Sequence, residues 1–344
     1  MTSGTGPTRV SSAVIRDWTA LALLAVALCV CAFYLTASVA PMNPHNGQTF
    51  MASQFAAAGG VELRQEWRPR VMSVAAAAFV ADRLWSAGLR PPELHLMVTV
   101  GFYSAIWMAL CCAVLLWGFG RRALVLAWGV LAAVTFAYAP GVATRVYPWD
   151  FPALFFFSAF VALYHRRIYK ALPVVILAGL PFKETTAVLC LSFLFLDLPM
   201  KVRLRYLIVT AVLFAGLKVA IDIAVHNPVP FFSMTSRTPN EGALRLVENL
   251  KSIARPQIAH PILINAGTLV ALALVRGRGR TVWMARSVAI AFAANTLMFA
   301  VIEEYRIWLE LAPLAAWILA ERFAWGGSEP GPPAEGRAPG TQSA

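Results

Sequence analysis

The stretch Leu180-Pro181-Phe182-Lys183-Glu184-Thr185-Thr186 decides how the rest of the chain is interpreted, because it places a lysine beside a glutamate between two apolar runs. Each run is shorter than the roughly 20 residues that an α-helix needs to cross a bilayer. A charged side chain at bilayer depth costs about 2.5–3.5 kcal/mol on insertion scales, so an intramembrane Lys-Glu pair is a candidate functional site. The structural alternative is an ion pair that only closes a kink.

The composition indicates a polytopic membrane protein. The 344 residues are 59% hydrophobic, with a mean hydropathy of +0.66, and apolar runs recur at lengths close to a membrane span. The formal net charge is +12, but the basic residues lie in short clusters between these runs, as the positive-inside rule predicts. A nucleic-acid partner is therefore not expected.

The basic clusters set the expected topology, with both termini on the cytoplasmic side. We expect an all-α protein with about eight full transmembrane helices, plus one broken hairpin within residues 171–198 (8–10 membrane helices in all). This hairpin is flanked by basic clusters on both sides, so it must enter the membrane and return to the same face. Its turn at 181–186 would open towards the outside, where non-helical backbone needs a protein-lined or wet cavity. The full spans are expected at about 19–40, 94–118, 123–138, 151–164, 205–225, 261–276, 280–303 and 303–321.

A single transmembrane domain is expected over residues 1–325, with long outer loops at 41–93 and 226–256. Within the first loop, residues 71–89 predict an interfacial or tucked-in helix, because Asp82 and Arg83 interrupt it. Residues 326–344 are rich in Gly, Pro and Ala and are expected to form a disordered cytoplasmic tail.

Several arginines fall on the predicted outer face, against the positive-inside rule. Long outer loops tolerate such residues, but a guanidinium also matches phosphate oxygens bidentately. Arg68 and Arg70 flank Pro69, which would project them from a fixed turn, and Arg145 precedes the stretch Tyr147-Pro148-Trp149-Asp150-Phe151-Pro152. In that stretch Asp150 is either a helix N-cap in an aromatic belt or a carboxylate beside a ligand that stacks on Trp149.

Two charged stripes are predicted near span ends. Glu303, Arg306 and Glu310 recur at i, i+3 and i+7, and Lys218, Asp222 and His226 follow at i+4 spacing. Salt bridging at a span end explains such stripes equally well, but buried charges in lipid must face partners or water. We expect both stripes to meet the cavity beside Lys183 and Glu184.

The sequence favours no metal site. The five cysteines lie inside apolar segments without zinc spacing, and the histidines lie mostly at span ends or in loops. We therefore expect neither disulfides nor a metal, and the sequence names no cofactor.

The order of these motifs resembles a group of bacterial multi-pass membrane proteins that carry an Asp-Phe-Pro element, an (Arg/Lys)-Glu-Thr element and an Arg-containing terminal span. That group is similar in layout to the GT-C glycosyltransferases, which move a sugar from a polyprenyl-phosphate donor on the outer side of the membrane. The resemblance covers roughly residues 139–198 and 303–322. It departs in one respect, because residues 41–81 contain no aspartate where GT-C enzymes usually place a catalytic one.

The resemblance implies a transferase of the bacterial plasma (inner) membrane that acts on a lipid-phosphate-linked sugar at the outer leaflet. Glu184 or Asp150 would be the catalytic carboxylate, with Glu62 or Glu66 as possible substitutes for the missing aspartate. The implied substrate-binding residues are Lys183, Arg68, Arg70, Arg145, Trp149, Glu303 and Arg306. Two other functions fit the same charges: a transporter or lipid flippase, and a non-catalytic membrane scaffold.

Overall fold

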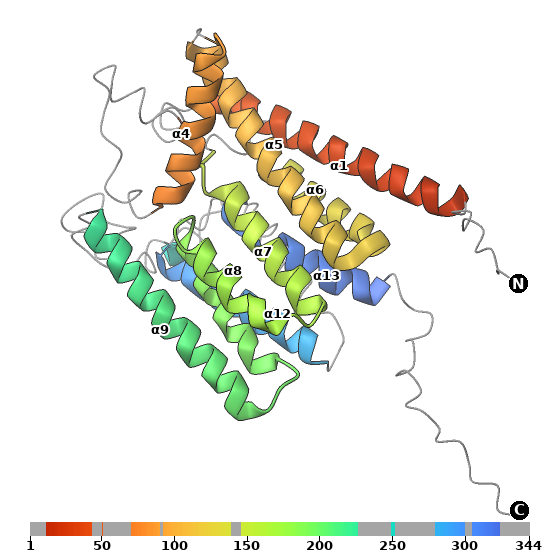
Figure 1. Cartoon of the computed structure of the whole chain (residues 1–344), viewed down its shortest axis with the longest axis vertical. Helices are drawn as coiled ribbons and strands as arrows, with labels where there is room; N and C mark the ends of the chain where they lie inside the picture. Colours follow the sequence, from red (N-terminus) through yellow and green to blue (C-terminus); the bar gives the residue numbers. More distant parts are fainter. Residues whose placement is uncertain are drawn as a thin grey trace, which may run out of the picture.

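The computed structural model describes residues 12–42, 50, 70–89, 92–138, 146–225, 249–251, 279–299 and 305–323 (Figure 1). The side chains of residues 12–18, 121, 124, 136, 299, 305–307 and 322–323 lie outside this description. Within the described ranges all regular secondary structure is helical, as expected. The longer elements are α1 (Ser12–Val39), α4 (Val71–Ser86), α5 (Pro92–Phe119), α6 (Ala123–Ala137), α7 (Asp150–His165), α8 (Leu172–Gly179), η5 (Glu184–Phe195), α9 (Met200–Ala224), α12 (Arg280–Phe299), η6 (Tyr305–Leu311) and α13 (Ala312–Phe323).

Three of these segments are long and apolar enough to cross a bilayer, namely Thr19–Met42, Pro92–Phe119 and Met200–Ala224. They indicate a membrane protein, as expected from composition. Shorter apolar helices cover Val125–Thr135, Asp150–His165, Tyr169–Gly179 and Glu184–Phe195. At about 1.5 Å per residue the 16 residues of α7 extend only about 24 Å, less than the roughly 30 Å hydrocarbon core. The all-helical membrane fold is thus confirmed, whereas the expectation of eight full spans is not.

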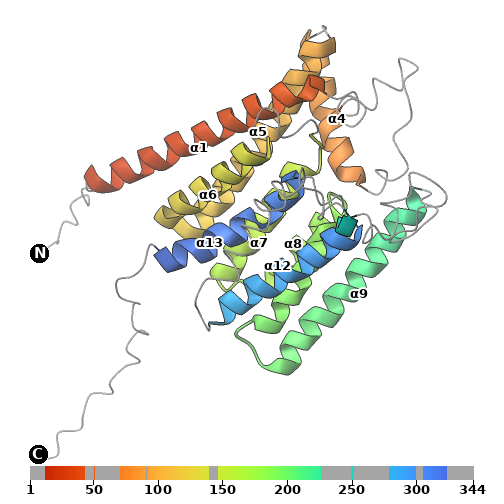
Figure 2. The same cartoon turned by 180° about the vertical axis from the view of Figure 1, so that it is seen from behind.

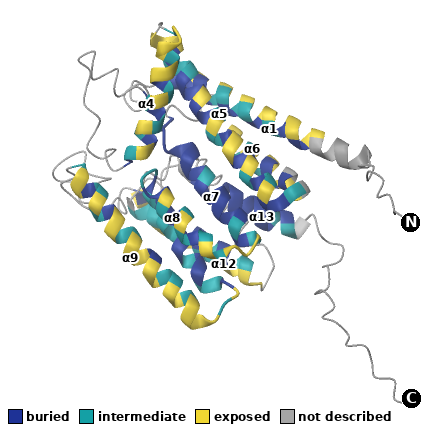
Figure 3. Ribbon diagram, in the orientation of Figure 1, coloured by how far each residue is buried: buried dark blue, intermediate teal, exposed yellow. Residues whose placement is uncertain are grey.

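The bundle is built around α7, which lies near its middle in both views (Figures 1 and 2). Nearly every residue of α7 is buried, because apolar and aromatic side chains surround the whole helix. Figure 3 shows α7 and α13 mostly buried, while α9 has an exposed outer side. That side carries Ile208, Val212 and Ile223, each at least 58% exposed, as expected for a surface that faces lipid.

Glycines allow close helix contacts in this core. A Cβ placed on Gly118 of α5 would lie 2.5 Å from the Cβ of Ala162 on α7, and one on Gly129 of α6 would lie 2.6 Å from that of Ala316 on α13. Small residues at membrane-helix interfaces let the backbones approach. These contacts bring α5 close to α7, and α6 close to α13.

The broken hairpin within residues 171–198 is present, with one change from expectation. Its first arm is α8, and the turn closes where the backbone amides of Phe182 and Lys183 donate to the Gly179 carbonyl at 3.0 and 2.9 Å. The second arm, η5, is a 3₁₀ helix of 12 residues. At about 2.0 Å per residue it extends about 24 Å, more than the same residues would reach as an α-helix.

The terminal span also begins as a 3₁₀ helix, η6, before α13 continues it. In a 3₁₀ helix the positions three apart eclipse, whereas in an α-helix the positions three and four apart share a face. Because the side chain of Arg306 lies outside the description, the stripe expected for Glu303, Arg306 and Glu310 stays a prediction. Glu303 itself lies outside the described residues.

The helix α4 corresponds to the tucked-in helix expected at 71–89. It packs against α5 and buries Ser73, Ala77 and Ala81. It is not among the helices long enough to span a bilayer. The predicted span at 261–276, the tail at 326–344 and most of the loops at 41–93 and 226–256 lie outside the described residues, apart from α4 and short flanking pieces.

Candidate functional site

Three helix N-termini converge on one group of charged side chains. Arg70 directly precedes α4, Asp150 is the first residue of α7, and Lys183 and Glu184 stand on either side of the start of η5. Contacts between these residues, described below, join the three ends. Because the N–H groups at a helix start are unpaired and the dipole is positive there, such ends favour negative charge. Asp150 and Glu184 each supply a carboxylate in the first turn of their helix.

Backbone contacts hold the three ends together. The Met72 amide at the start of α4 donates to the Pro181 carbonyl at 3.2 Å, and the Ser73 hydroxyl donates to the Phe182 carbonyl at 3.2 Å. On the other side, the Tyr103 hydroxyl of α5 donates to the Pro148 carbonyl at 2.8 Å. The hairpin turn and the turn before α7 are thus fixed by direct hydrogen bonds, although both consist of irregular backbone.

The deeper part of the site is an inner triad made of Asp150, Lys183 and Glu310. Lys183 Nζ lies 2.5 Å from Glu310 Oε1 and 3.7 Å from Asp150 Oδ1. The side chains are 6% exposed for Lys183, 0% for Asp150 and 1% for Glu310. The Thr185 hydroxyl donates to Glu310 Oε2. These contacts bind η5 to α7 and η6 by charge.

The geometry of the inner triad leaves Lys183 incompletely satisfied. Despite its short distance to Glu310, Lys183 Nζ makes no hydrogen bond of acceptable geometry to any described residue, and Glu310 Oε1 likewise makes none. The contact is a close ion pair between the buried ammonium and carboxylate groups. An ammonium group offers three donors, so a buried acceptor from a ligand or a water would stabilise it.

Asp150 is held by more than Lys183. Its Oδ2 accepts hydrogen bonds from the Tyr138 hydroxyl at 3.0 Å and from the Tyr147 amide at 3.1 Å. The second bond closes the turn that starts α7, together with the Asp150 amide donating to the Tyr147 carbonyl at 3.2 Å. Asp150 is thus both a turn-forming residue and a counter-ion. Trp149, not Asp150, occupies the N-cap position.

The shallower part of the site is an outer pair, Arg70 and Glu184. Arg70 Nε lies 3.2 Å from Glu184 Oε2, and the two side chains are 9% and 15% exposed. The Arg70 guanidinium also lies over Trp149, 4.2 Å from the ring centroid. Trp149 stacks in turn on Tyr147 with centroids 4.6 Å apart. With both contacts in place Trp149 is only 2% exposed, so its ring is occupied by protein groups.

The structure brings together several of the residues singled out in the sequence. Lys183, Glu184, Asp150, Arg70 and Trp149 form one continuous group of contacts. Arg68, Arg145 and Glu303 lie outside the described residues, and so does the side chain of Arg306. On α9, Lys218 Nζ lies 2.5 Å from Asp222 Oδ1, and both residues are buried, while His226 lies outside the described residues.

Four further residues complete the site: Tyr103, Tyr138, Thr185 and Glu310. In the sequence, Glu310 drew notice only as part of a charged stripe. Thr185 could have been found from its place next to Lys183 and Glu184. The two tyrosines carry no sequence signal of their own, because aromatic residues near span ends are common.

No protein-family model, no curated protein and no solved structure matches the chain.

Proposed function

We propose that the chain is a multi-pass membrane transferase, similar in layout to the GT-C glycosyltransferases, that acts on a sugar linked to a lipid phosphate. The observation that supports this most is the convergence of the N-termini of α4, α7 and η5 on Arg70 and Lys183. In secondary transporters, the N-termini of broken helices point at the anionic groups of substrates, and a helix N-terminus in general favours an anion. A guanidinium and an ammonium beside them favour a phosphate ester as the ligand.

The same proposal includes the topology expected from the basic clusters. The chain would lie in the bacterial plasma membrane with eight full spans and both termini cytoplasmic. The group formed by the inner triad and the outer pair would then face the outer leaflet, where a polyprenyl-phosphate sugar presents its head group. Arg68, Arg145, Glu303 and Arg306 remain proposed contributors to phosphate or sugar binding.

The contacts divide the two candidate carboxylates by role. Asp150 is fully buried and accepts two hydrogen bonds while facing Lys183, so we assign it to positioning that lysine. Glu184 is the more exposed carboxylate at 15% and has Arg70 as its ion-pair partner, so we assign it as the general base. Glu184 would accept the proton of an acceptor hydroxyl as that oxygen attacks the anomeric carbon of the sugar.

In this step a glycosidic bond forms and the bond from the sugar to the lipid phosphate breaks. The lipid phosphate leaves with the bonding electron pair, and its negative charge would be stabilised by Arg70 and by the converging helix ends. Arg70 would exchange its contact with Glu184 for one with phosphate. That exchange would free the Glu184 carboxylate for the acceptor hydroxyl.

The experiment is transfer by the purified protein in vesicles that contain a radiolabelled polyprenyl-phosphate sugar. Glu184→Gln is expected to lower the rate by about 10²–10⁴-fold, the usual contribution of a general base. The control is Glu93→Gln, which changes an exposed glutamate in the first turn of α5. Equal transfer rates for Glu184→Gln and wild type would contradict the assignment of Glu184 as the general base. If the wild-type protein transferred no sugar from any donor, the proposal that it is a transferase would be contradicted.

A transporter is the second candidate, favoured by the inner triad. Buried ionisable groups in membrane proteins commonly mark ion or substrate pathways, and Lys183 Nζ lacks a hydrogen bond among the described residues. The same vesicles separate the two functions. Transport would move intact labelled donor to the opposite leaflet, whereas transfer would leave unlabelled lipid phosphate and a labelled acceptor.

A further inference from the structure

Two protein groups stack on the ring of Trp149, the residue just before α7. The Arg70 guanidinium lies over the indole at 4.2 Å from its centroid. The Tyr147 ring lies nearly parallel to the indole, at 9° and with the centroids 4.6 Å apart. All three residues are buried, and Trp149 is only 2% exposed. The indole therefore presents no open face to a sugar ring.

The contact with Trp149 orients Arg70 for hydrogen bonding. A guanidinium that stacks on an aromatic ring uses its flat face, so its N–H groups still point outward in the guanidinium plane. In this arrangement Arg70 Nε donates to Glu184 Oε2 at 3.2 Å. The indole thus fixes the plane in which Arg70 meets an acceptor, and a bidentate contact with phosphate depends on that plane.

The two stacked rings are held by the turn before α7. The Tyr147 amide donates to Asp150 Oδ2 at 3.1 Å, and the Asp150 amide donates to the Tyr147 carbonyl at 3.2 Å. Pro148 lies between the two aromatic residues and restricts the backbone further, because its ring fixes φ. Both rings therefore belong to one hydrogen-bonded turn, and Arg70 packs against them from the start of α4.

We propose that Trp149 is a positioning residue for Arg70, and that the group bound at this point is the phosphate of the lipid-linked substrate and not its sugar. This inference rests on the proposed function, since it assigns one part of that substrate to Arg70. When phosphate replaces Glu184 as the acceptor, Arg70 keeps its place on the indole and changes only its hydrogen-bond partner. The arginine side chain is then ordered before the substrate binds, which raises the affinity for phosphate.

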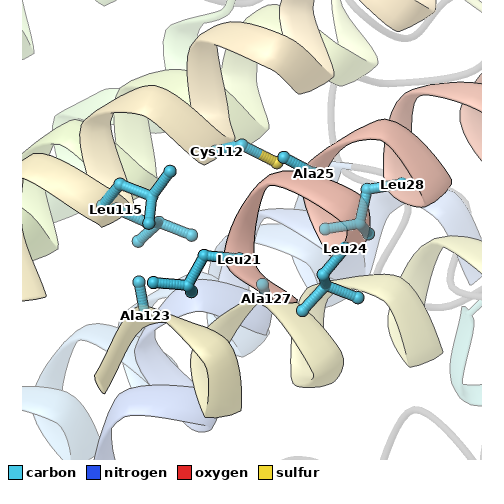
Figure 4. A pocket seen from close by; sticks show the side chains of 9 residues that line it. Leu21, Leu24, Ala25, Leu28, Cys112, Leu115, Ala123 and Ala127 are labelled. Atoms are coloured by element: carbon cyan, nitrogen blue, oxygen red, sulfur yellow. The ribbon is translucent and has the colours of Figure 1, made fainter. Parts of the chain in front are cut away.

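The apolar hollow between α1, α5 and α6 offers the sugar no alternative place (Figure 4). Leucine, alanine and cysteine side chains from these three helices line it. It has room for about 10 Å³, enough for one water-sized group, whereas the hydroxyls of a buried sugar need polar partners. We therefore assign the sugar to the side of Glu184, the more exposed member of the outer pair at 15%.

The test is binding of two lipids by the purified protein in nanodiscs: undecaprenyl phosphate, which carries no sugar, and undecaprenyl-phosphate glucose. Trp149→Leu removes the aromatic face but keeps an apolar side chain. It is expected to weaken the binding of both lipids by the same factor, about tenfold. A loss confined to the glucose-bearing lipid would show that Trp149 stacks on the sugar and would overturn the proposal.

A double variant tests whether Trp149 acts through Arg70. Arg70→Gln is expected to weaken the binding of both lipids, and adding Trp149→Leu to it is expected to cause no further loss. A further tenfold loss in the double variant would contradict the positioning role. The matched control is Trp117→Leu, which removes an indole whose centroid lies 4.9 Å from the Arg166 guanidinium, and it is expected to leave binding unchanged.

Trp149→Phe keeps the proposal open to refutation if Trp149→Leu does not fold. Phenylalanine keeps an aromatic face with a weaker cation–π attraction, so a loss of about two- to threefold is expected, equal for the two lipids. An unchanged affinity, or a loss for only one lipid, would contradict the positioning role of Trp149 and leave the transferase standing. If wild type bound neither lipid, this inference and the proposed function would both be contradicted.

Discussion

Replacing Lys183 by methionine is expected to lower the free energy of unfolding by about 3–5 kcal/mol, the cost of leaving a buried charge uncompensated. The magnitude follows from the surroundings of Lys183 Nζ, which lies 2.5 Å from Glu310 and 3.7 Å from Asp150. Both carboxylates are at most 1% exposed. Without the ammonium group, two negative charges would face each other away from water, since methionine supplies similar volume but no charge.

A double variant tests whether charge, and not packing, causes this loss. Glu310→Gln in the Lys183→Met background removes one of the two unpaired charges, while Asp150 keeps its hydrogen bonds from Tyr138 and Tyr147. The two substitutions are therefore expected to be non-additive, with an interaction energy of about 0.5–3 kcal/mol. The double variant should be more stable than the sum of the single effects predicts.

The assay is unfolding of the purified protein by sodium dodecyl sulfate in mixed micelles, followed by circular dichroism. Lys170→Met, at an exposed lysine before the hairpin, is the control and is expected to change the free energy by no more than about 0.5 kcal/mol. The reasoning would be refuted if Lys183→Met behaved like this control. It would also be refuted if the two substitutions were strictly additive.

Three further predictions concern single contacts, and the same unfolding assay checks each. Gly179→Ala should lower the free energy of unfolding by about 1–3 kcal/mol, because the added Cβ would lie 2.6 Å from Thr186 Cγ2. Gly216→Ala in α9, where the added Cβ would meet open space, is the control and should not lower it. Equal losses of stability in the two variants would contradict this prediction. Tyr103→Phe should cost about 0.5–1.5 kcal/mol through loss of the bond to the Pro148 carbonyl, and an unchanged stability would show that this bond contributes nothing. Arg203→Gln should lower the free energy of unfolding by about 1–3 kcal/mol, because Arg203 donates to the Leu198 and Leu194 carbonyls at 2.6 and 3.0 Å. An unchanged stability would contradict the role of Arg203 in capping the end of η5.

The helix positions could be predicted from the sequence because apolar runs and basic clusters report directly on membrane helices. The segments expected at 94–118 and 123–138 correspond to α5 and α6 within two residues at each end. The broken hairpin was also predictable, since basic clusters flank two runs that are too short to span. Its 3₁₀ second arm was not, because the choice between i→i+3 and i→i+4 hydrogen bonds depends on tertiary packing.

For the candidate site, the sequence indicated which residue types stand out but not how they pair. Lys183 and Glu184 are neighbours in the chain, yet they do not pair with each other. Because Lys183 has an extended backbone with φ −160° and ψ 130° just before η5, the two side chains leave the chain in different directions. Lys183 meets Asp150 and Glu310, while Glu184 meets Arg70. Such pairing follows from the convergence of distant helix ends, which no local pattern reports.

The 3₁₀ form of η5 has a consequence for how far the charged residues lie from the other end of this arm. The same 12 residues would be about 6 Å shorter as an α-helix, at 1.5 instead of 2.0 Å per residue. Arg203 holds the carbonyls of Leu194 and Leu198 at one end of η5, and Lys183 and Glu184 stand at the other. The distance from Arg203 to the charged residues is therefore set by the hydrogen-bond pattern of this arm as much as by its length in residues.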